Sequence, residues 1–155
     1  MTLSAESSAA WFPSSAPAGH SHRVERLLSL PGQRLASLGG NGRVIVWGLG
    51  GASAAQAAAW SLAGADKARG LAATTDGAAL LCGCNSGDIT AFSCASGAKL
   101  AVLSPGKVRS PVLACALSDD GRWVLGAYAA GIVARWEVVT AAEEWAGAPA
   151  EGGEE

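Results

Sequence analysis

The sequence has little charge and few of the residues that carry catalysis. Only 15% of its 155 residues are charged, the formal net charge is −2, and there are two histidines. This balance provides no overall basic field of the kind that holds a protein on nucleic acid. The sequence also lacks a convincing catalytic nucleophile and base, a phosphate-binding loop and a spaced set of metal ligands. We therefore expect a protein that is not an enzyme and holds no cofactor or metal.

Long apolar runs and a disulfide framework are missing as well. No run reaches the 18 apolar residues that a membrane span needs, and residues 1–19 lack the pattern of a signal peptide. Four cysteines lie inside apolar runs, without the dense spacing of secreted scaffolds. Cys82 and Cys84 would share a strand face and could touch a soft metal, but no second Cys or His pair lies near, so we interpret them as buried hydrophobes. An intracellular protein, cytoplasmic or nuclear and without membrane contact, is expected.

Glycine is abundant, and it follows a regular pattern. The 21 glycines and the 50% hydrophobic content point to a core built from many short segments. From Arg23 onward, short apolar runs alternate with turn signals. These signals are Pro31-Gly32, Asn41-Gly42, Asp76-Gly77, Ser86-Gly87, Asp120-Gly121 and Ala130-Gly131.

One unit recurs three times along the chain. Its inner part is a run, a turn and a second run that closes on an aromatic residue, at Trp47, Phe92 and Trp136, 45 and 44 residues apart. An apolar run precedes each inner part, and a further run follows the first two. Four short strands with tight turns describe an antiparallel meander, as in a propeller blade. The expected strands are 24–30, 34–38, 43–47 and 57–62, then 69–73, 79–83, 88–92 and 98–103, then 112–117, 123–127 and 132–136.

The first unit resembles a WD repeat through Gly19-His20, Leu35-Ala36-Ser37, Asn41-Gly42 and the closing Trp47. The other two units are degenerate, with Cys82 in place of the Ser. The resemblance implies an all-β fold of WD-repeat β-propeller blades, a partial propeller of about three four-stranded blades. It also implies a hydrogen-bonded network that pins the first blade. The network residues would be His20, Ser37, Asn41 and Trp47, with Phe92 and Trp136 as the closing aromatics of the other blades.

The resemblance divides the chain into three parts. Residues 19–140 form the propeller segment, with blades at about 19–62, 64–103 and 106–138. Residues 1–18 are expected to be a flexible leader, and residues 141–155 an acidic, disordered tail with five glutamates. Three repeats do not close a ring of four to eight blades. The chain is therefore a piece of a larger propeller, completes a partner's propeller, or pairs with a second copy.

Basic residues recur where the chain leads into the first strand of each unit. In WD propellers these loops line one face, so a positive rim would form there and attract an acidic peptide, a phosphorylated partner or a nucleic-acid backbone. The alternative is that these loops are simply polar and solvated. The rim residues are His22, Arg23, Lys67, Arg69, Lys107 and Arg109.

The function implied by the resemblance is that of a non-catalytic protein–protein interaction scaffold or adaptor subunit in a multiprotein complex. A first alternative is a nucleic-acid-associated subunit that uses the basic rim, and salt-sensitive binding to RNA or DNA would distinguish it. A second alternative is a propeller enzyme or ligand sensor. That alternative needs histidines and carboxylates on the inner strands, where the sequence has almost none.

Overall fold

The computed structural model of the protein describes residues 19–49, 55–62, 67–106 and 109–138. The expected leader at 1–18, the expected acidic tail at 141–155 and Lys107 of the expected rim lie outside these ranges. In the part of the chain that the structure describes, no helix is long and apolar enough to cross a membrane.

The described residues form eleven strands, each within two residues of a run expected from the sequence. Glycines in the left-handed conformation form the turn before the third strand of each unit, as at Gly42 with φ of 78° and Gly131 with φ of 76°. The strands are β1 (Val24–Leu30), β2 (Arg34–Gly39), β3 (Arg43–Gly48), β4 (Ala55–Ser61), β5 (Ala68–Ala73), β6 (Ala79–Cys84), β7 (Ile89–Ser93), β8 (Lys99–Leu103), β9 (Val112–Leu117), β10 (Trp123–Tyr128) and β11 (Val133–Glu137).

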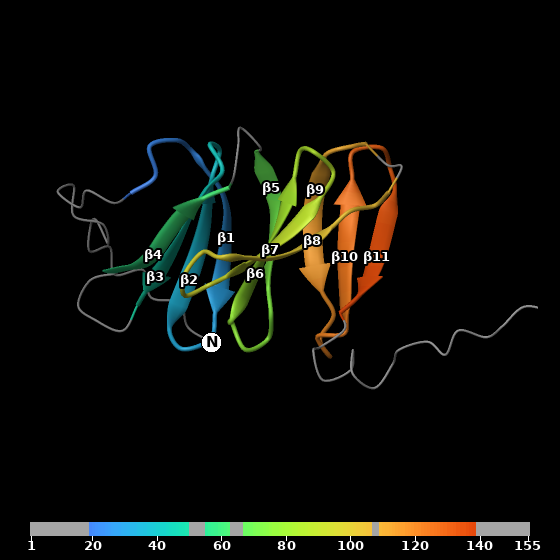
Figure 1. The fold of residues 1–155 in the computed structure, drawn as a ribbon. Helices are drawn as coiled ribbons and strands as arrows, with labels where there is room; N and C mark the ends of the chain where they lie inside the picture. Colours follow the sequence, from blue (N-terminus) through green and yellow to red (C-terminus); the bar gives the residue numbers. More distant parts are fainter. Residues whose placement is uncertain (1–18, 50–54, 63–66, 107–108, 139–155) are drawn as a thin grey trace, which may run out of the picture.

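The strands form three antiparallel meanders that stand side by side (Figure 1). The first sheet has the order β1-β2-β3-β4 and the second has β5-β6-β7-β8. The third sheet has β9, β10 and β11, so among the described residues it is one strand short of the other two. The residues that would follow β11 as a fourth strand begin at 139, outside the described ranges.

Two apolar clusters join the three sheets. The cluster between the first and second sheets is built from residues such as Leu38, Val44, Leu80 and Phe92. The cluster between the second and third sheets includes Ile89, Val112, Val124 and Tyr128. Alternate residues of each strand face opposite sides of a sheet, so the second sheet contributes one face to each cluster. This stacking places β1, β5 and β9 next to one another, all starting at the upper end of Figure 1.

Candidate functional site

Ser37 on β2 lies at the centre of a buried hydrogen-bond network in the first sheet. The indole N–H of Trp47 donates to Ser37 Oγ at 2.8 Å, and His20 Nε2 lies 2.7 Å from the same oxygen. Ser37 Oγ also lies 3.4 Å from the carbonyl oxygen of Ile45. Ser37 and Trp47 are 2% and 6% exposed, so the network is shielded from water.

The hydrogen-bond partners of His20 indicate which of its ring nitrogens carries the hydrogen. Burial, and after it the positive charge of Arg43, holds the pKa of His20 below its usual value, so the ring is neutral near pH 7. The Trp47 indole only donates, whereas the Ser37 hydroxyl has one hydrogen and two lone pairs. A hydrogen on His20 Nε2 satisfies three bonds, because His20 and Trp47 both donate to Ser37 and Ser37 donates to Ile45. It also leaves Nδ1, which has no partner among the described residues, as an acceptor only.

Asn41 lies beside this network without a hydrogen bond to His20. Its side-chain oxygen accepts from the backbone N–H of Arg43 at 3.2 Å, and its side-chain nitrogen lies 3.5 Å from Ser21 Oγ. The structure therefore joins three of the four expected network residues. Gly39 allows this close approach, since a Cβ there would lie 2.5 Å from His20 Nδ1 and 2.9 Å from Asn41 Oδ1.

The aromatics of the other two sheets pack in apolar surroundings. Phe92 is 6% exposed, and its ring centroid lies 6.5 Å from that of Trp60 on β4. Trp136 on β11 is half-buried and lies over Gly126, where a Cβ would be 3.2 Å from its Cζ3. One hydrogen bond between the third and second sheets was not expected from the sequence. The hydroxyl of Tyr128 donates to the carbonyl oxygen of Gly87 at 3.0 Å.

Each first strand carries a β-bulge at the same place near its upper end. The register shifts at Glu25 in β1, at Arg69 in β5 and at Leu113 in β9, positions that are 44 residues apart. A bulge turns an extra side chain out of the regular alternation, and bulges are enriched beside functional sites. The three bulges therefore place an acidic, a basic and an apolar side chain in equivalent positions of adjacent strands.

The charges around Glu25 are strongly unbalanced. Arg23 Nε donates to Glu25 Oε1 at 2.6 Å, and this hydrogen bond is the first cause of the lowered pKa of the Glu25 carboxyl. The positive charges of Arg23, Arg69 and Arg26 lower it further, against an opposing effect of burial. One carboxylate thus feels the positive charge of three guanidinium groups, from β1 and β5 and from the residue before β1. The Arg26 guanidinium itself donates to the backbone carbonyl oxygen of Glu25 at 2.8 Å. Arg26 was not among the residues singled out from the sequence.

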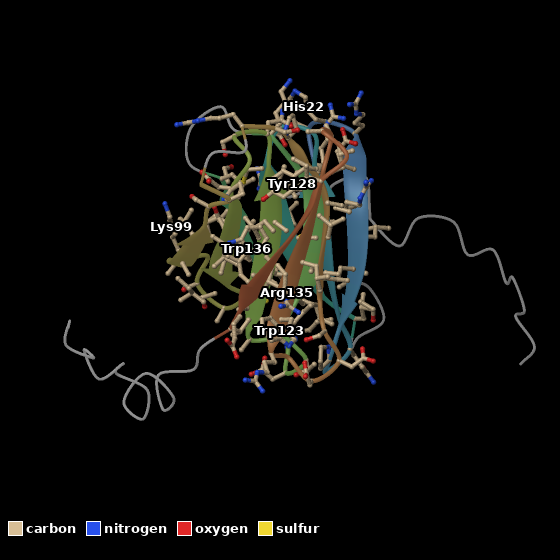
Figure 2. All side chains as sticks on the ribbon, turned by 90° about the vertical axis from the view of Figure 1, so that its right-hand side faces the viewer. His22, Lys99, Trp123, Tyr128, Arg135 and Trp136 are labelled. Carbon is tan, nitrogen blue, oxygen red and sulfur yellow. The ribbon has the colours of Figure 1, made fainter. Side chains whose placement is uncertain are left out.

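The remaining expected rim residues in the described ranges are not among the charges that act on Glu25. His22, Lys67 and Arg109 are exposed, and Figure 2 places His22 at the upper end of the molecule. The Lys67 carbonyl oxygen accepts a hydrogen bond from the backbone N–H of Asn85 at 2.9 Å. Among the residues that the structure describes, the side chains of Lys67 and Arg109 form no hydrogen bond or ion pair. We use the name upper rim for Arg23, Arg26, Lys67, Arg69 and Arg109.

The pair formed by His20 and Ser37 has the spacing of a base and a nucleophile, but its surroundings prevent such chemistry. The Ser37 oxygen is buried and already receives the Trp47 N–H, so a substrate has no path to it. In the described ranges, no group of three or more His, Cys, Asp or Glu side chains could hold a metal ion.

A groove of about 310 Å³ lies between β4 and the outer strands of the second sheet. Leu62, Phe92 and Val102 supply apolar walls, and Asp88 and Lys99 supply charges of opposite sign. The Asp88 carboxylate already accepts a hydrogen bond from Ser104 Oγ at 2.6 Å. The groove therefore offers no cluster of like charge comparable with the upper rim.

Comparison with solved structures decides the fold. The chain is similar to the C-terminal WD40 domain of Sif2, with a TM-score of 0.67 and 13% sequence identity over 79% of this chain. It is also similar to the β-propeller domain of Cps50 (Swd1) from Myceliophteria thermophila, with a TM-score of 0.64 and 10% identity over 75% of this chain. The chain has the WD-repeat β-propeller fold.

The three sheets are therefore three blades of such a propeller. The chain spans 36% and 38% of the lengths of the two propeller domains. No family model matches the sequence, and no curated protein matches it. WD-repeat propellers serve in general as scaffolds for protein interactions, and at these identities the likeness establishes the fold alone.

Proposed function

We propose that this chain is a non-catalytic scaffold or adaptor that binds an acidic or phosphorylated segment of another protein through the upper rim. The observation that supports the proposal is that the single Glu25 carboxylate bonds Arg23 and also feels the positive charges of Arg26 and Arg69. Guanidinium groups bind carboxylates and phosphates in a planar, two-point geometry that suits this class of partner. Leu113, the third bulge residue and 39% exposed, adds an apolar contact beside the charges.

In this proposal Glu25 limits affinity in the free protein. Its carboxylate holds Arg23 at 2.6 Å, so an acidic partner displaces an existing ion pair when it binds. The Arg23 side chain is 81% exposed, and an exposed pair of this kind contributes little to stability. A partner that brings two carboxylates or one phosphate therefore competes well.

Fluorescence anisotropy with three labelled peptides tests the proposal. One peptide alternates Glu with Ser, the second carries phosphoserine, and the third replaces each Glu by Lys. We expect the first two to bind and the third not to bind. Affinity should fall steeply as salt is added.

Variants of the rim make the test specific. Arg26→Ala and Arg69→Ala should weaken acidic-peptide binding, and Glu25→Gln should strengthen it. Lys99→Ala, which removes one exposed positive charge from β8, is the matched control and should change nothing. Equal binding by all four variants would refute the proposal. Tighter binding of a single-stranded oligonucleotide than of the peptides would favour the nucleic-acid alternative.

We further propose that the protein works inside the cell, as part of a larger propeller. All four cysteines are free, and burial raises the pKa of the Cys82 and Cys115 thiols, the latter to about 12. Thiols kept in this state accord with a reducing compartment. The coverage of 36% and 38% of known propeller domains supports additional blades supplied by further residues or by another chain.

A further inference from the structure

The outer edge of β11 is the one place where the repeat of the blades is incomplete among the described residues. In the first two blades the third strand pairs with a fourth, β3 with β4 and β7 with β8. No described residue pairs with the outer edge of β11. The edge is also apolar in part, since Val133 is 69% exposed and Ile132 is 40% exposed. Unpaired apolar strand edges are templates for pairing with another chain.

The backbone hydrogen bonds between β11 and β10 show which residues of β11 point their N–H and C=O groups toward the unpaired edge. The Ile132 carbonyl oxygen accepts from Tyr128 N at 2.9 Å, and Val138 N donates to Arg122 O at 2.7 Å, so both residues point their backbone groups toward β10. Backbone groups alternate in direction along an antiparallel strand. The N–H and C=O groups of Val133, Arg135 and Glu137 therefore point outward.

Two charges of opposite sign flank Trp136 on this strand. The Arg135 guanidinium lies 4.2 Å from the centre of the Trp123 ring, and no described carboxylate lies within ion-pair distance of it. Figure 2 shows Arg135 and Trp123 next to each other on the third blade. Both hydrogen bonds that Arg122 donates to Glu137 end on Oε1. Oε2 of Glu137 accepts no hydrogen bond from the described residues and can accept one from another donor.

This charge order makes the edge complementary to itself in one register. In antiparallel pairing of two β11 strands, outward-pointing residues must meet outward-pointing residues. A pairing centred on Arg135 places two arginines opposite each other, and one centred on Glu137 places two glutamates opposite each other. A pairing centred on Trp136 instead sets Arg135 opposite the partner's Glu137, twice over, and brings the two Trp136 side chains together on the other face.

We propose that two copies of this chain associate edge to edge through β11, in the register centred on Trp136. The second copy's strand then lies where β4 and β8 lie in the complete blades, and the two three-stranded sheets become one sheet of six strands. Residues 134–138 of each copy form the pairing. This contact is short, so the dimer is weak and forms in a concentration-dependent manner.

Sedimentation equilibrium of the full chain over a wide concentration range tests the proposal directly. Amide hydrogen exchange is followed in the same samples. We expect a monomer–dimer equilibrium in which exchange at Arg135 and Glu137 slows as the dimer forms. Exchange in β6, inside the second blade, should not depend on concentration.

Charge reversal tests the register. Arg135→Glu and Glu137→Arg should each abolish the dimer at concentrations where the unaltered chain is mostly dimeric. The doubly reversed chain should dimerise again, and an equimolar mixture of the two single variants should form a heterodimer. Arg109→Glu, the same charge change on the upper rim, is the control and should leave the dimer intact.

Three results would overturn the proposal. A chain that stays monomeric at every concentration has no such contact. Single reversals that dimerise like the unaltered chain would exclude the charge pairs. Protection of the β11 edge at all concentrations, lost on deletion of residues 139–155, would show that the chain's own last residues occupy it. The exchange series needs no variant, so the test does not depend on how the reversed chains fold.

Discussion

The first and second blades share one strand pattern and are held together by different chemistry. In the first blade, Ser37 binds His20 and Trp47 through hydrogen bonds in a nearly dry site. In the second blade, Cys82 occupies the place of Ser37 and is 0% exposed, with Phe92 as the closing aromatic. The Ser37 and Cys82 side chains are buried at equivalent positions of their second strands. The third blade has Gly126 at the equivalent position, with the Trp136 ring lying over it. The comparison teaches that a hydrogen-bonded network is one of several ways to build this position of a blade.

The largest expected loss of stability comes from removing the buried aromatic residue of the second blade. Phe92→Ala should lower the free energy of unfolding by about 4 kcal/mol, because it empties a buried site against Trp60 and the first blade. Trp136→Ala should cost less, since Trp136 is only half-buried. Urea unfolding monitored by circular dichroism measures both. A larger loss of unfolding free energy for Trp136→Ala than for Phe92→Ala would contradict this prediction.

The next largest loss of stability comes from removing the hydrogen-bond network of the first blade. Ser37→Ala leaves the Trp47 N–H and the His20 ring without their shared partner and should cost about 2 to 3 kcal/mol. Cys82→Ala is the matched change in the second blade and should cost about 1 kcal/mol, because it strands no donor. The same urea titration compares them. Equal losses would mean that the network contributes no more than its packing.

A smaller effect tests how tightly the network is packed. Gly39→Ala should cost about 1 to 2 kcal/mol, since its Cβ would meet His20 Nδ1 and Asn41 Oδ1. Gly19→Ala has nothing within 4 Å of the new Cβ and serves as the control. Thermal unfolding should separate the two variants. If Gly39→Ala unfolds like Gly19→Ala, the network has room that the structure does not show.

The smallest effect is a pH dependence confined to the first blade. The pKa of His20 is lowered in the folded chain, so the unfolded chain takes up this proton first as the pH falls below 6.5. The stability contribution is therefore complete above pH 6.5 and is lost as the pH falls through the folded pKa. We expect the melting temperature to decrease over this window, and His20→Gln to reduce the decrease. An unchanged slope in His20→Gln would assign the effect to other groups.

The strands were predictable because turn signals and apolar runs are local properties of the sequence. The detachment of Asn41 from the network was not, since its amide oxygen is taken by the nearby backbone N–H of Arg43. This competition depends on turn geometry that the residue types alone do not determine.

The grouping of Glu25 with Arg69 was also beyond the sequence. The two residues are 44 positions apart, and the charge of Arg69 acts on Glu25 because β1 and β5 lie next to each other and each carries a bulge at the same place. The repeat length indicated equivalent positions, but it did not show that a bulge turns those side chains out of the alternation. For the same reason Arg26 was missed as a member of the upper rim.

The Tyr128 hydroxyl connects the third blade to the turn of the second, and it belongs to the only tyrosine of the chain. Burial, together with the negative charge of Asp88, raises the pKa of this phenol. The protein therefore contains a natural spectroscopic probe of the interface between its second and third blades. Titration of the tyrosine absorbance with rising pH follows the contact between these two blades without any added label. If the third blade moved away while the first two stayed folded, Tyr128 would lose its proton at the lower pH that is usual for an exposed tyrosine.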